Sequence, residues 1–515
     1  MTGRAAMTPS TSTSTLAAGS RSTARLFQLL ILTLALVPAF LFMQGCGGAA
    51  PSAAAAASTQ PSGPSIAPTT ANIQVWQTYQ FSVSGPNAGA SCTWATSDAS
   101  ILSSLGGGEF QGMQTGTAKV TVTCDGASAN ASVVIAAQQQ SGPIQITSGG
   151  TYSGNWTSND PATPAVTIRT DDPVVLQDSV ISGKGTLIDI SGVKNGADVT
   201  IENVTATGLD PQTAGTQRGS FVNATQFDSL IVRNCTMTGV SFGVKAYAAS
   251  PSTLSIVNNS ATDLEDRASD GQGGFEASRP SKGHFVILNG IAASAGAEIA
   301  WNKVVQTIGQ SSTEDVINIY NSQGSAGSPI EVHDNYLEGA SSPVYTTHYT
   351  GTALITDGTG TNGATPTAFV AFNDNQVVAT AGTGLGIAAG HDISASGNRI
   401  VSCGMTANGN WYAWGASAIV IWNYYQSASF YNNTITTSAG GMMGPNTNGQ
   451  PTVYDVWTNT ADMADPGISV SGNDFTNPCV ASSGVNLQAE QAERTYWTNK
   501  IAQAGEVIGD QHLNN

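Results

Sequence analysis

The sequence predicts an all-β chain, most of which winds into a stack of short parallel strands. Of its 515 residues, 40% are apolar and 58 are glycine, and the apolar residues gather in short Val- and Ile-rich runs. Only 10% are charged, so small polar residues fill the intervening turns. A short apolar run that ends in Asn recurs along the chain. We therefore expect a parallel β-helix over residues 143–515.

Asparagine marks the corners of the predicted coils. Asn tolerates the left-handed backbone of a tight corner, and Asn side chains stacked about 4.8 Å apart can hydrogen-bond as a ladder. The intervals vary from 23 residues (Asn375 to Asn398) to 43 (Asn259 to Asn302), which predicts a constant core with variable loops. A β-propeller would need longer repeats, with about four strands in each. The nine corner residues are Asn203, Asn234, Asn259, Asn302, Asn335, Asn375, Asn398, Asn433 and Asn473.

This repeat resembles that of the right-handed parallel β-helix proteins of the pectate-lyase-like superfamily, over about residues 143–500. The resemblance implies a right-handed solenoid that handles a polysaccharide. It does not choose an activity, because this fold hosts lyases, hydrolases, epimerases and adhesins. Residues 485–503 have a helix-compatible composition. We expect a C-terminal cap there, since an open solenoid end must cover its exposed strand edge.

The N-terminus has the plan of an export signal. Residues 1–25 carry three arginines and no acid, and an apolar stretch follows at 26–43. The next residues, Gln44-Gly45-Cys46, resemble a bacterial lipobox, although Met43 and Gln44 depart from its commonest residues. The resemblance implies removal of residues 1–45 and lipidation of Cys46. The alternative is an uncleaved signal anchor, because 18 apolar residues nearly span a bilayer.

With either a lipoprotein signal or a signal anchor, we expect the chain to be exported to the cell envelope, on the periplasmic side or at the cell surface. Its N-terminus would hold it to a membrane. Residues 46–71 are rich in Gly, Ala, Ser, Pro and Thr, which predicts a flexible tether.

Residues 72–136 predict a small Ig-like β-sandwich, because polar and apolar residues alternate in several short runs. The segment resembles the bacterial Ig-like (Big2) domain. The matching residues are Gln77-Thr78, Trp94 with Ser97-Asp98, and Gly116-Thr117-Ala118. The resemblance implies a spacer or a weakly adhesive module, and no catalysis is expected in it.

The cysteines divide into two groups. Cys92 and Cys124 fall within the Ig-like segment, and in an exported protein we expect them to form a disulfide. Cys235, Cys403 and Cys479 are far apart in sequence and share no metal-ligand spacing. We expect these three to be buried free thiols.

The charge balance limits the partners. The net charge is −17, and removal of residues 1–45 leaves 14 basic against 34 acidic residues, or −20. Nucleic acid is excluded, since neutralising phosphates needs clustered Lys and Arg. A polyanionic glycan would be repelled unless bound cations such as Ca²⁺ bridged it to the protein.

Candidate catalytic residues fall at similar distances before the Asn corners. If loops do not intervene, His284, Asp315 and Asp357 lie near the same face of three consecutive coils. The intervals are 18 residues from His284 to Asn302, 20 from Asp315 to Asn335 and 18 from Asp357 to Asn375.

Two chemistries fit such a groove. The first is glycoside hydrolysis by a carboxylate pair drawn from Glu314, Asp315 and Asp357. The second is β-elimination from a uronate, with Lys282, His284 or His391 as the base and Ca²⁺ on the carboxylate. His391-Asp392 could form a catalytic dyad, although a turn histidine bonded to a carbonyl is an equal alternative.

Aromatic side chains gather late in the chain and could stack on sugar rings. The alternative is that they pack beneath loops or inside the coil. Trp422 and Tyr424 alternate along one strand, so they share a single face. The predicted substrate-binding residues are His348, Tyr349, Trp411, Trp414, Trp422 and Tyr424.

The sequence therefore predicts a monomeric cell-envelope lipoprotein that acts on an extracellular polysaccharide, with a hydrolase ahead of a lyase. A non-catalytic glycan-binding adhesin with the same fold is the rival from another class. The identity of the sugar, the linkage and any need for calcium stay open.

Overall fold

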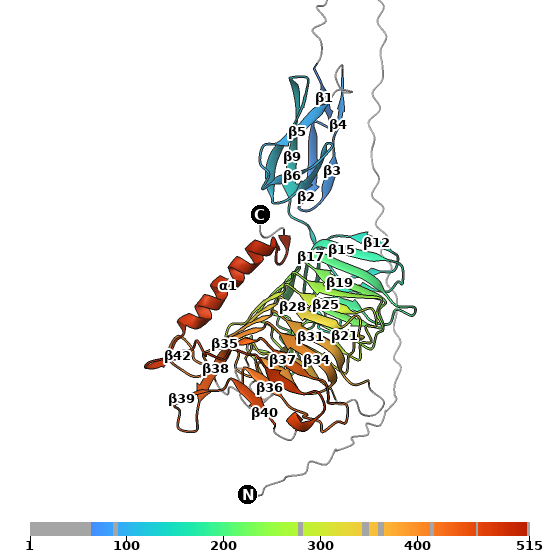
Figure 1. Ribbon diagram of the computed structural model, residues 1–515. Coiled ribbons are helices and arrows are strands. Elements are labelled where there is room, and N and C mark those ends of the chain that lie inside the picture. The colour runs from blue at the N-terminus through green and yellow to red at the C-terminus, as the bar shows by residue number, and fades with distance from the viewer. Residues whose placement is uncertain are drawn as a thin grey trace, which may run out of the picture. The chain divides into compact units, whose positions relative to one another are not determined.

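A computed structural model describes residues 63–85, 91–276, 282–341, 350–358, 365–412, 417–459 and 462–511. The predicted signal and the predicted lipidation of Cys46 lie outside these ranges. Within them the chain forms a small Ig-like β-sandwich and then a right-handed parallel β-helix (Figure 1). In the described ranges, no helix is both long and apolar enough to cross a membrane.

The sandwich is built from antiparallel strand pairs and one parallel strand pair. Its core side chains alternate with exposed ones, as in β8, where Ala118, Val120 and Val122 are buried. Cys92 and Cys124 face each other across β5 and β8 and are joined by a disulfide, the pairing expected from the sequence. The strands are β1 (Ser65–Ala67) with β4 (Ser82–Ser84); β2 (Thr70–Gln74), β9 (Ala127–Ala136), β8 (Gly116–Cys124) and β5 (Cys92–Thr96); and β3 (Thr78–Gln80), β7 (Glu109–Gly112) and β6 (Leu102–Gly106).

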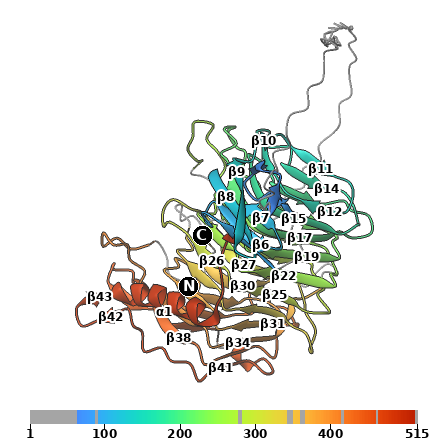
Figure 2. The ribbon, with the colours of Figure 1, turned by 90° about the horizontal axis from the view of Figure 1, so that it is seen from above.

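The β-helix repeats a unit of three strands per coil. The first two strands belong to a 21-stranded sheet and meet at the Asn corner, and the third belongs to an 11-stranded sheet. One such coil is β25 (Ala297–Ala300), β26 (Lys303–Val305) and β27 (Asp315–Tyr320). Strands of successive coils lie side by side in chain order and pair in parallel (Figure 2).

The remaining strands of the 11-stranded sheet are β11 (Ile144–Ile146), β14 (Val166–Ile168), β16 (Ile188–Ile190), β18 (Val222–Thr225), β21 (Phe242–Tyr247), β24 (His284–Asn289), β30 (Thr352–Asp357), β33 (Leu385–Ile387), β36 (Ile419–Ile421) and β40 (Val456–Thr458). Those of the 21-stranded sheet are β10 (Gln140–Ser141), β12 (Gly150–Tyr152), β13 (Asn155–Ser158), β15 (Val174–Gly183), β17 (Asp198–Gly208), β19 (Ser229–Arg233), β20 (Thr236–Thr238), β22 (Thr253–Val257), β23 (Ser260–Thr262), β28 (Ile330–His333), β29 (Tyr336–Glu338), β31 (Ala368–Asn373), β32 (Gln376–Val378), β34 (His391–Ser396), β35 (Arg399–Ser402), β37 (Thr434–Thr436), β38 (Ala439–Pro445), β39 (Pro451–Val453) and β41 (Ser469–Ser471). Two short strands, β42 (Val480–Ala481) and β43 (Gly484–Val485), pair with each other.

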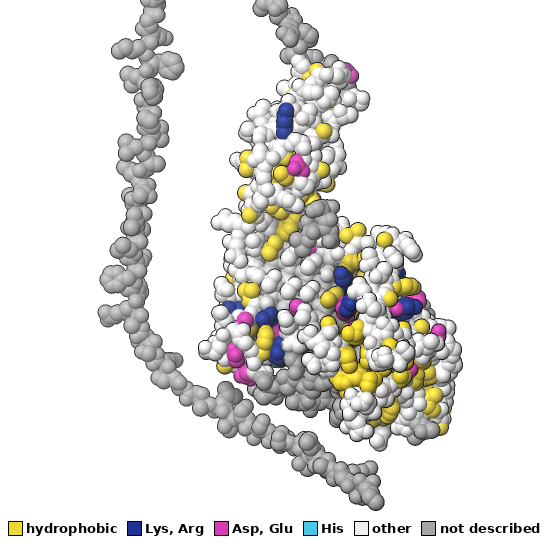
Figure 3. Space-filling model, turned by 90° about the vertical axis from the view of Figure 1, so that its left-hand side faces the viewer, with side chains coloured by type: hydrophobic (Ala, Val, Ile, Leu, Met, Phe, Trp, Pro, Cys, Tyr) yellow, Lys and Arg dark blue, Asp and Glu magenta, His cyan; other side chains and the backbone are white. Residues whose placement is uncertain are grey.

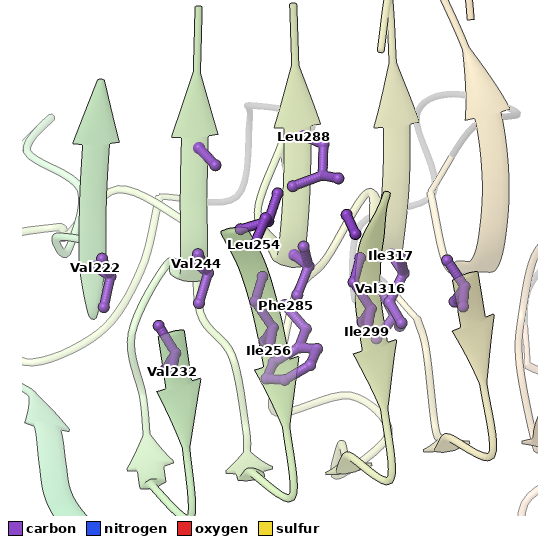
Figure 4. Close-up of a cluster of buried hydrophobic side chains, with 14 of the residues drawn as sticks. Val222, Val232, Val244, Leu254, Ile256, Phe285, Leu288, Ile299, Val316 and Ile317 are labelled. Atoms are coloured by element: carbon purple, nitrogen blue, oxygen red, sulfur yellow. The ribbon is translucent and has the colours of Figure 1, made fainter. Parts of the chain in front are cut away.

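Apolar side chains from both long sheets fill the interior of the coils. Val244 and Ile317 of the 11-stranded sheet point toward Ile256 and Ile299 of the other sheet (Figure 4). All four are fully buried. Because each coil is too thin to bury these side chains alone, stacking on the neighbouring coils completes the core.

Five asparagines form a hydrogen-bonded ladder at the corner. Asn259 Nδ2 donates to Asn302 Oδ1 at 3.0 Å, and Asn302 Nδ2 donates to Asn335 Oδ1 at 2.9 Å. Asn335 continues to Asn375 at 2.9 Å, and Asn375 continues to Asn398 at 3.0 Å. All five side chains are fully buried. The stacking predicted from the sequence is therefore present over these coils.

The prediction assigned both the left-handed backbone and the ladder hydrogen bonds to one Asn, whereas two successive residues provide them. The left-handed backbone belongs to the residue before each ladder position, such as Trp301 (φ 56°) and Asp334 (φ 51°). Asn234 takes that left-handed position (φ 52°). The buried Cys235 then holds the ladder position level with Asn259, and its backbone N–H donates to Asn259 Oδ1. Asn203 is left-handed in the same way (φ 52°).

Asn433, also predicted as a corner, does follow a left-handed residue, Asn432 (φ 52°), but it belongs to a second column and not to the ladder. It pairs with the backbone N–H of Ile393, five residues before the ladder position that Ser438 occupies. The backbone N–H of Ser438 donates to Asn473 Oδ1 of the next coil at 2.8 Å, as the backbone N–H groups of the first four ladder Asn residues do to the Asn that follows each of them. The Ser438 hydroxyl donates to the Thr436 carbonyl of its own coil, so the side chain does not extend the amide ladder.

The predicted C-terminal helix is present as α1 (Gln488–Ala504), but it lies along the side of the coils and not over their end (Figure 1). Trp497 is buried and stacks on Tyr336, with ring centroids 5.4 Å apart. Three ion pairs tie α1 to two coils: Arg494–Glu338 and Lys500–Asp334 to the coil of Asn335, and Arg399–Glu493 to the coil of Asn398. On the side of the molecule that carries α1, Lys and Arg side chains accordingly lie beside Asp and Glu side chains (Figure 3).

The prediction of three free thiols is also wrong in part. Cys403 and Cys479 form a disulfide that joins the coil region to the segment before α1. Sequence distance concealed this pair, because the stacking of coils brings residues separated by 76 positions together. Of the cysteines in the described ranges, Cys235 alone is free, and it is fully buried.

Candidate active site

A pocket of about 760 Å³ lies on the outer face of the 11-stranded sheet, over its last five strands. Its lining combines four carboxylates with five Trp and Tyr side chains. Among the described residues that line it, none is Lys or Arg. The lining residues are Glu314, Asp315, Thr352, Ile355, Asp357, Thr383, Gly386, Ala388, Ser417, Val420, Trp422, Tyr424, Tyr425, Val453, Tyr454, Asp455, Val456 and Trp457.

Strand register arranges the floor of the pocket in columns. Asp315 pairs with Thr352, and the same register continues through Thr383 and Ser417, each two residues before its strand begins. This polar column faces the pocket with one carboxyl or hydroxyl group per coil. A second column runs parallel to it and is apolar toward its end; it contains Asn318, Ile355, Gly386, Val420 and Trp457.

Glu314 and Asp315 supply the acidic end of the polar column. Asp315 is 5% exposed, and Asn318 Nδ2 donates to its Oδ2 at 2.8 Å. Burial, together with the charges of Glu314 and Asp357, raises the pKa of Asp315 well above its usual range. Partial burial raises the pKa of Glu314 to about 7, and Asp357 and Asp266 add to this rise. Glu314 can therefore carry a proton near neutral pH.

His284 lies beside this pair, in register with Asp315 on the neighbouring strand. Its Nδ1 is 3.0 Å from the Asp315 carbonyl oxygen, which can only accept, so Nδ1 carries the hydrogen. Its Nε2 faces Glu314 Oε2 at 3.9 Å. Burial lowers the pKa of His284 to about 4, so the imidazole is neutral at physiological pH.

Asp357 approaches the same pocket from the far end of β30. The Tyr425 hydroxyl donates to Asp357 Oδ1 at 2.5 Å. Burial and the Asp357 charge raise the pKa of Tyr425 far above its usual value, so the phenol keeps its proton and stays a donor. This bond orients the Asp357 carboxylate.

Aromatic rings form a wall of the same pocket. Trp422 meets Tyr424 and Trp457 edge to face, with centroids 4.7 and 5.3 Å apart. Tyr424 meets Tyr425 in the same way at 4.9 Å. Tyr424 and Trp457 are 38% and 43% exposed, so part of each ring is open to a ligand. Such faces bind the apolar faces of sugar rings.

The predicted line of His284, Asp315 and Asp357 is correct for the first two and wrong for the third. The β30 residue in register with Asp315 is Thr352, and Asp357 pairs with Tyr320 at the other end of the strands. The loop before the next Asn corner is longer in this coil, so equal sequence intervals do not mean equal register. Glu314, Asp315 and Asp357 nevertheless line one pocket.

The other predicted catalytic residues are not among the lining residues. Lys282 is exposed, and its backbone N–H donates to Asp266 Oδ2; its charge lowers the pKa of Glu314. His391 and Asp392 belong to β34 of the 21-stranded sheet, where Nδ1 lies 2.7 Å from Asp392 Oδ2 and the imidazole stacks on Tyr431. The structure therefore does not bring this dyad to the pocket.

Of the predicted sugar-binding residues, Trp422 and Tyr424 line the pocket. Trp411 does not line it, and its Nε1 donates to the Gly449 carbonyl at 3.3 Å. His348, Tyr349 and Trp414 lie outside the described residues.

Sequence reasoning missed Tyr454, Asp455 and Trp457 as lining residues. They follow β38 and β39 in a coil that has Ser438 and not Asn at its corner. Without an Asn, their distance from the corner could not be counted in the sequence. It also missed the hydroxyl column of Thr352, Thr383 and Ser417. A uniform run of Thr and Ser at one register position was the available signal, but loop lengths hid the register.

Three side chains beside the pocket are close enough together to be considered as ligands for Ca²⁺. His284, Glu314 and Asp315 each offer one ligand atom within 4.8 Å of the others. Ca²⁺ takes six to eight oxygen ligands, whereas this group includes an imidazole nitrogen, and the pKa of both carboxyls is raised. These residues do not fit a calcium site.

No protein-family model matches the chain, and no curated protein matches it significantly.

Proposed function

We propose that this chain is a cell-envelope enzyme that hydrolyses an extracellular polysaccharide in the pocket of the 11-stranded sheet. The observation that carries the proposal is that Glu314, with a pKa of about 7, shares one pocket with Asp357 and an aromatic wall. Glycoside hydrolysis needs such a pair, one carboxyl group protonated and the other ionised.

Glu314 is the general acid in this proposal. Its carboxyl group donates a proton to the glycosidic oxygen as the bond to the leaving sugar breaks. Asp357 is the second carboxylate, either taking a proton from the attacking water or attacking the anomeric carbon itself. Asp315 is buried next to Glu314, and burial together with the charge of Glu314 raises the pKa of Asp315.

The proposal includes the wider assignment suggested by the sequence. The β-helix would belong to the pectate-lyase-like superfamily, and the sandwich would be a Big2 spacer. A lipid on Cys46 would hold the monomeric chain to a membrane, so that the pocket meets polysaccharide outside the cytoplasm.

A lyase is the second candidate, favoured by one observation. His284 is neutral, with its pKa lowered to about 4, and its Nε2 is directed toward Glu314, so it could take the C5 proton of a uronate. The absence of Lys and Arg among the described lining residues weakens this candidate, because nothing there would hold a uronate carboxylate.

A polysaccharide panel distinguishes the candidates. The purified protein is incubated with xylan, arabinan, laminarin and homogalacturonan in its methyl-esterified and de-esterified forms, with and without chelator. New reducing ends without ultraviolet absorbance indicate a hydrolase, and absorbance from unsaturated products indicates a lyase. Binding without either product indicates the adhesin and contradicts the proposal.

A further inference from the structure

We infer that the pocket accepts one end of an uncharged glycan chain, which enters from the β40 side, and releases short sugars from that end. This inference rests on the proposed hydrolase function and adds the mode of attack and the substrate class. Three features carry it: the greater exposure of the lining at the β40 end, the placement of Glu314, Asp315 and Asp357 toward the β27 end, and the charge of the lining.

The floor of the pocket is buried at the β27 end. There, Asp315 is 5% exposed, Asn318 4% and Thr352 4%. The next strand toward the N-terminus, β24, adds no described residue to the lining, and its His284 and Ile287 are themselves buried. The backbone N–H of Glu314 donates to the Gly283 carbonyl, which packs the segment before β24 against this end.

The opposite end is open. Val453, Val456 and Trp457 are 44%, 41% and 43% exposed, and all three line the pocket. They belong to the last coils, beside β36 and β40 (Figure 1). These three residues at the β40 end are therefore more exposed than Asp315 and Thr352 at the β27 end.

Glu314, Asp315 and Asp357 lie toward the β27 end. The fourth lining acid, Asp455, lies at the β40 end, where its Oδ1 accepts hydrogen bonds from the backbone N–H of Met442 and from Asn477 Nδ2. Glu314 and Asp315 belong to the β27 coil and Asp357 to the β30 coil, whereas the aromatic rings belong to the β36 and β40 coils. The five strands span about 19 Å, given a separation of about 4.8 Å between neighbours. A chain lying along the stack thus meets Glu314, Asp315 and Asp357 with its end, and its following sugars lie against the aromatic wall.

The lining selects an uncharged sugar. Glu314, Asp315, Asp357 and Asp455 all line the pocket, and no Lys or Arg does so among the residues described. A uronate carboxylate would enter a site of its own charge without a partner, which is unfavourable at short range. The hydroxyls of Thr352, Thr383 and Ser417 instead offer donors and acceptors to sugar hydroxyls.

Product analysis on the panel polysaccharide with the highest turnover tests this inference. At low conversion we expect one short product from the first time point, with little loss of viscosity, and no turnover of chains whose ends are chemically blocked. We also expect neutral polymers to be preferred over de-esterified homogalacturonan. Products of random length with a rapid loss of viscosity, or a preference for the uronate polymer, would overturn the inference.

A variant at the open end provides a second readout. Trp457→Ala should raise KM for the polymer by about tenfold, the effect of one lost stacking contact. Tyr496→Ala, which removes an aromatic side chain on α1 that is 47% exposed, is the matched control and should leave KM unchanged. An unaltered KM in Trp457→Ala would contradict entry from this side.

The two proposals fail in different ways. Absence of turnover on every polymer, with no difference between the wild type and a Glu314→Gln variant, removes the hydrolase and with it this inference. Random internal cleavage that is lost in Glu314→Gln removes the inference alone and leaves the hydrolase standing.

Discussion

The Asn corner and the pocket floor are both columns of polar side chains repeated from coil to coil, but they differ in how those side chains are satisfied. At the corner, each buried Asn amide both donates to the next coil and accepts from the previous one. In the pocket column, Asp315 lies between His284 and Thr352 and beside Glu314, and the pKa of both carboxyls is raised.

The difference follows from hydrogen-bonding capacity. An amide carries a donor and an acceptor and is complementary to a copy of itself, whereas an ionised carboxylate only accepts. Stacking therefore stabilises a column of Asn and opposes a group of carboxylates. A carboxylate cluster that persists against this cost, in a pocket, indicates a functional site.

Glu314→Gln should produce the largest effect. The variant keeps the shape of the side chain and loses the proton donor, so we expect kcat to fall at least ~100-fold. Initial rates on the best panel substrate check this, with Glu331→Gln on β28, outside the pocket, as the control. An equal loss in both variants would show that the carboxyl group of Glu314 has no special role.

Asn335→Ala should have the largest effect on the stability of the Asn ladder. The substitution removes the acceptor of both the backbone N–H and the Nδ2 of Asn302, in a fully buried position. We expect the free energy of unfolding to fall by about 2–4 kcal/mol. Denaturant unfolding measures it, and Asn373→Ala, at a half-buried position on β31, should cost less than about 1 kcal/mol.

The pH dependence of stability should come from the pocket carboxyl groups and not from the Asn ladder. The pKa of Glu314 is raised from 4.5 to about 7 in the folded chain, so the folded state binds the proton more tightly. Its contribution to stability is present below pH 4.5 and is lost as the pH rises through 7. The thermal midpoint should therefore fall less between pH 5 and 8 in Glu314→Gln than in the wild type.

The rate should follow the same group. If Glu314 donates the proton, kcat falls as the pH rises above about 7, because the acid ionises. A kcat that stays constant from pH 6 to 9 would contradict this assignment. Asn335→Ala, measured where it remains folded, should keep the wild-type pH profile.

His391→Gln should have the smallest effect. The residue lies on the 21-stranded sheet and does not line the pocket, so we expect kcat/KM to change by less than about twofold. A large loss would show that the chemistry lies on the other sheet. A matched measurement on Asp392→Asn tests the neighbouring member of the dyad.

The fold was largely predictable, since its cause is local and repeated. The apolar runs and the Asn that follows each of them predict coils, and Asn259, Asn302, Asn335, Asn375 and Asn398 stack as expected. The prediction failed where the repeat was imperfect. Cys235 and Ser438 hold ladder positions, and neither can be recognised without the register.

The candidate site was predictable only in part. Its acids were found because charged residues are scarce, so Glu314, Asp315 and Asp357 were conspicuous. Register was not predictable, because loops between the third strand of a coil and the next corner differ in length. Hence Asp357 was placed level with Asp315, although Thr352 holds that level.

By itself, the sequence determined that the chain stacks coils around an apolar core, since period and hydrophobicity are properties of neighbouring residues. Only the tertiary structure decided which distant residues share a face: Cys403 with Cys479, Trp497 with Tyr336, and Glu314 with Trp422. The physical reason is that a solenoid fixes the spacing between coils but not the length of chain spent in each turn.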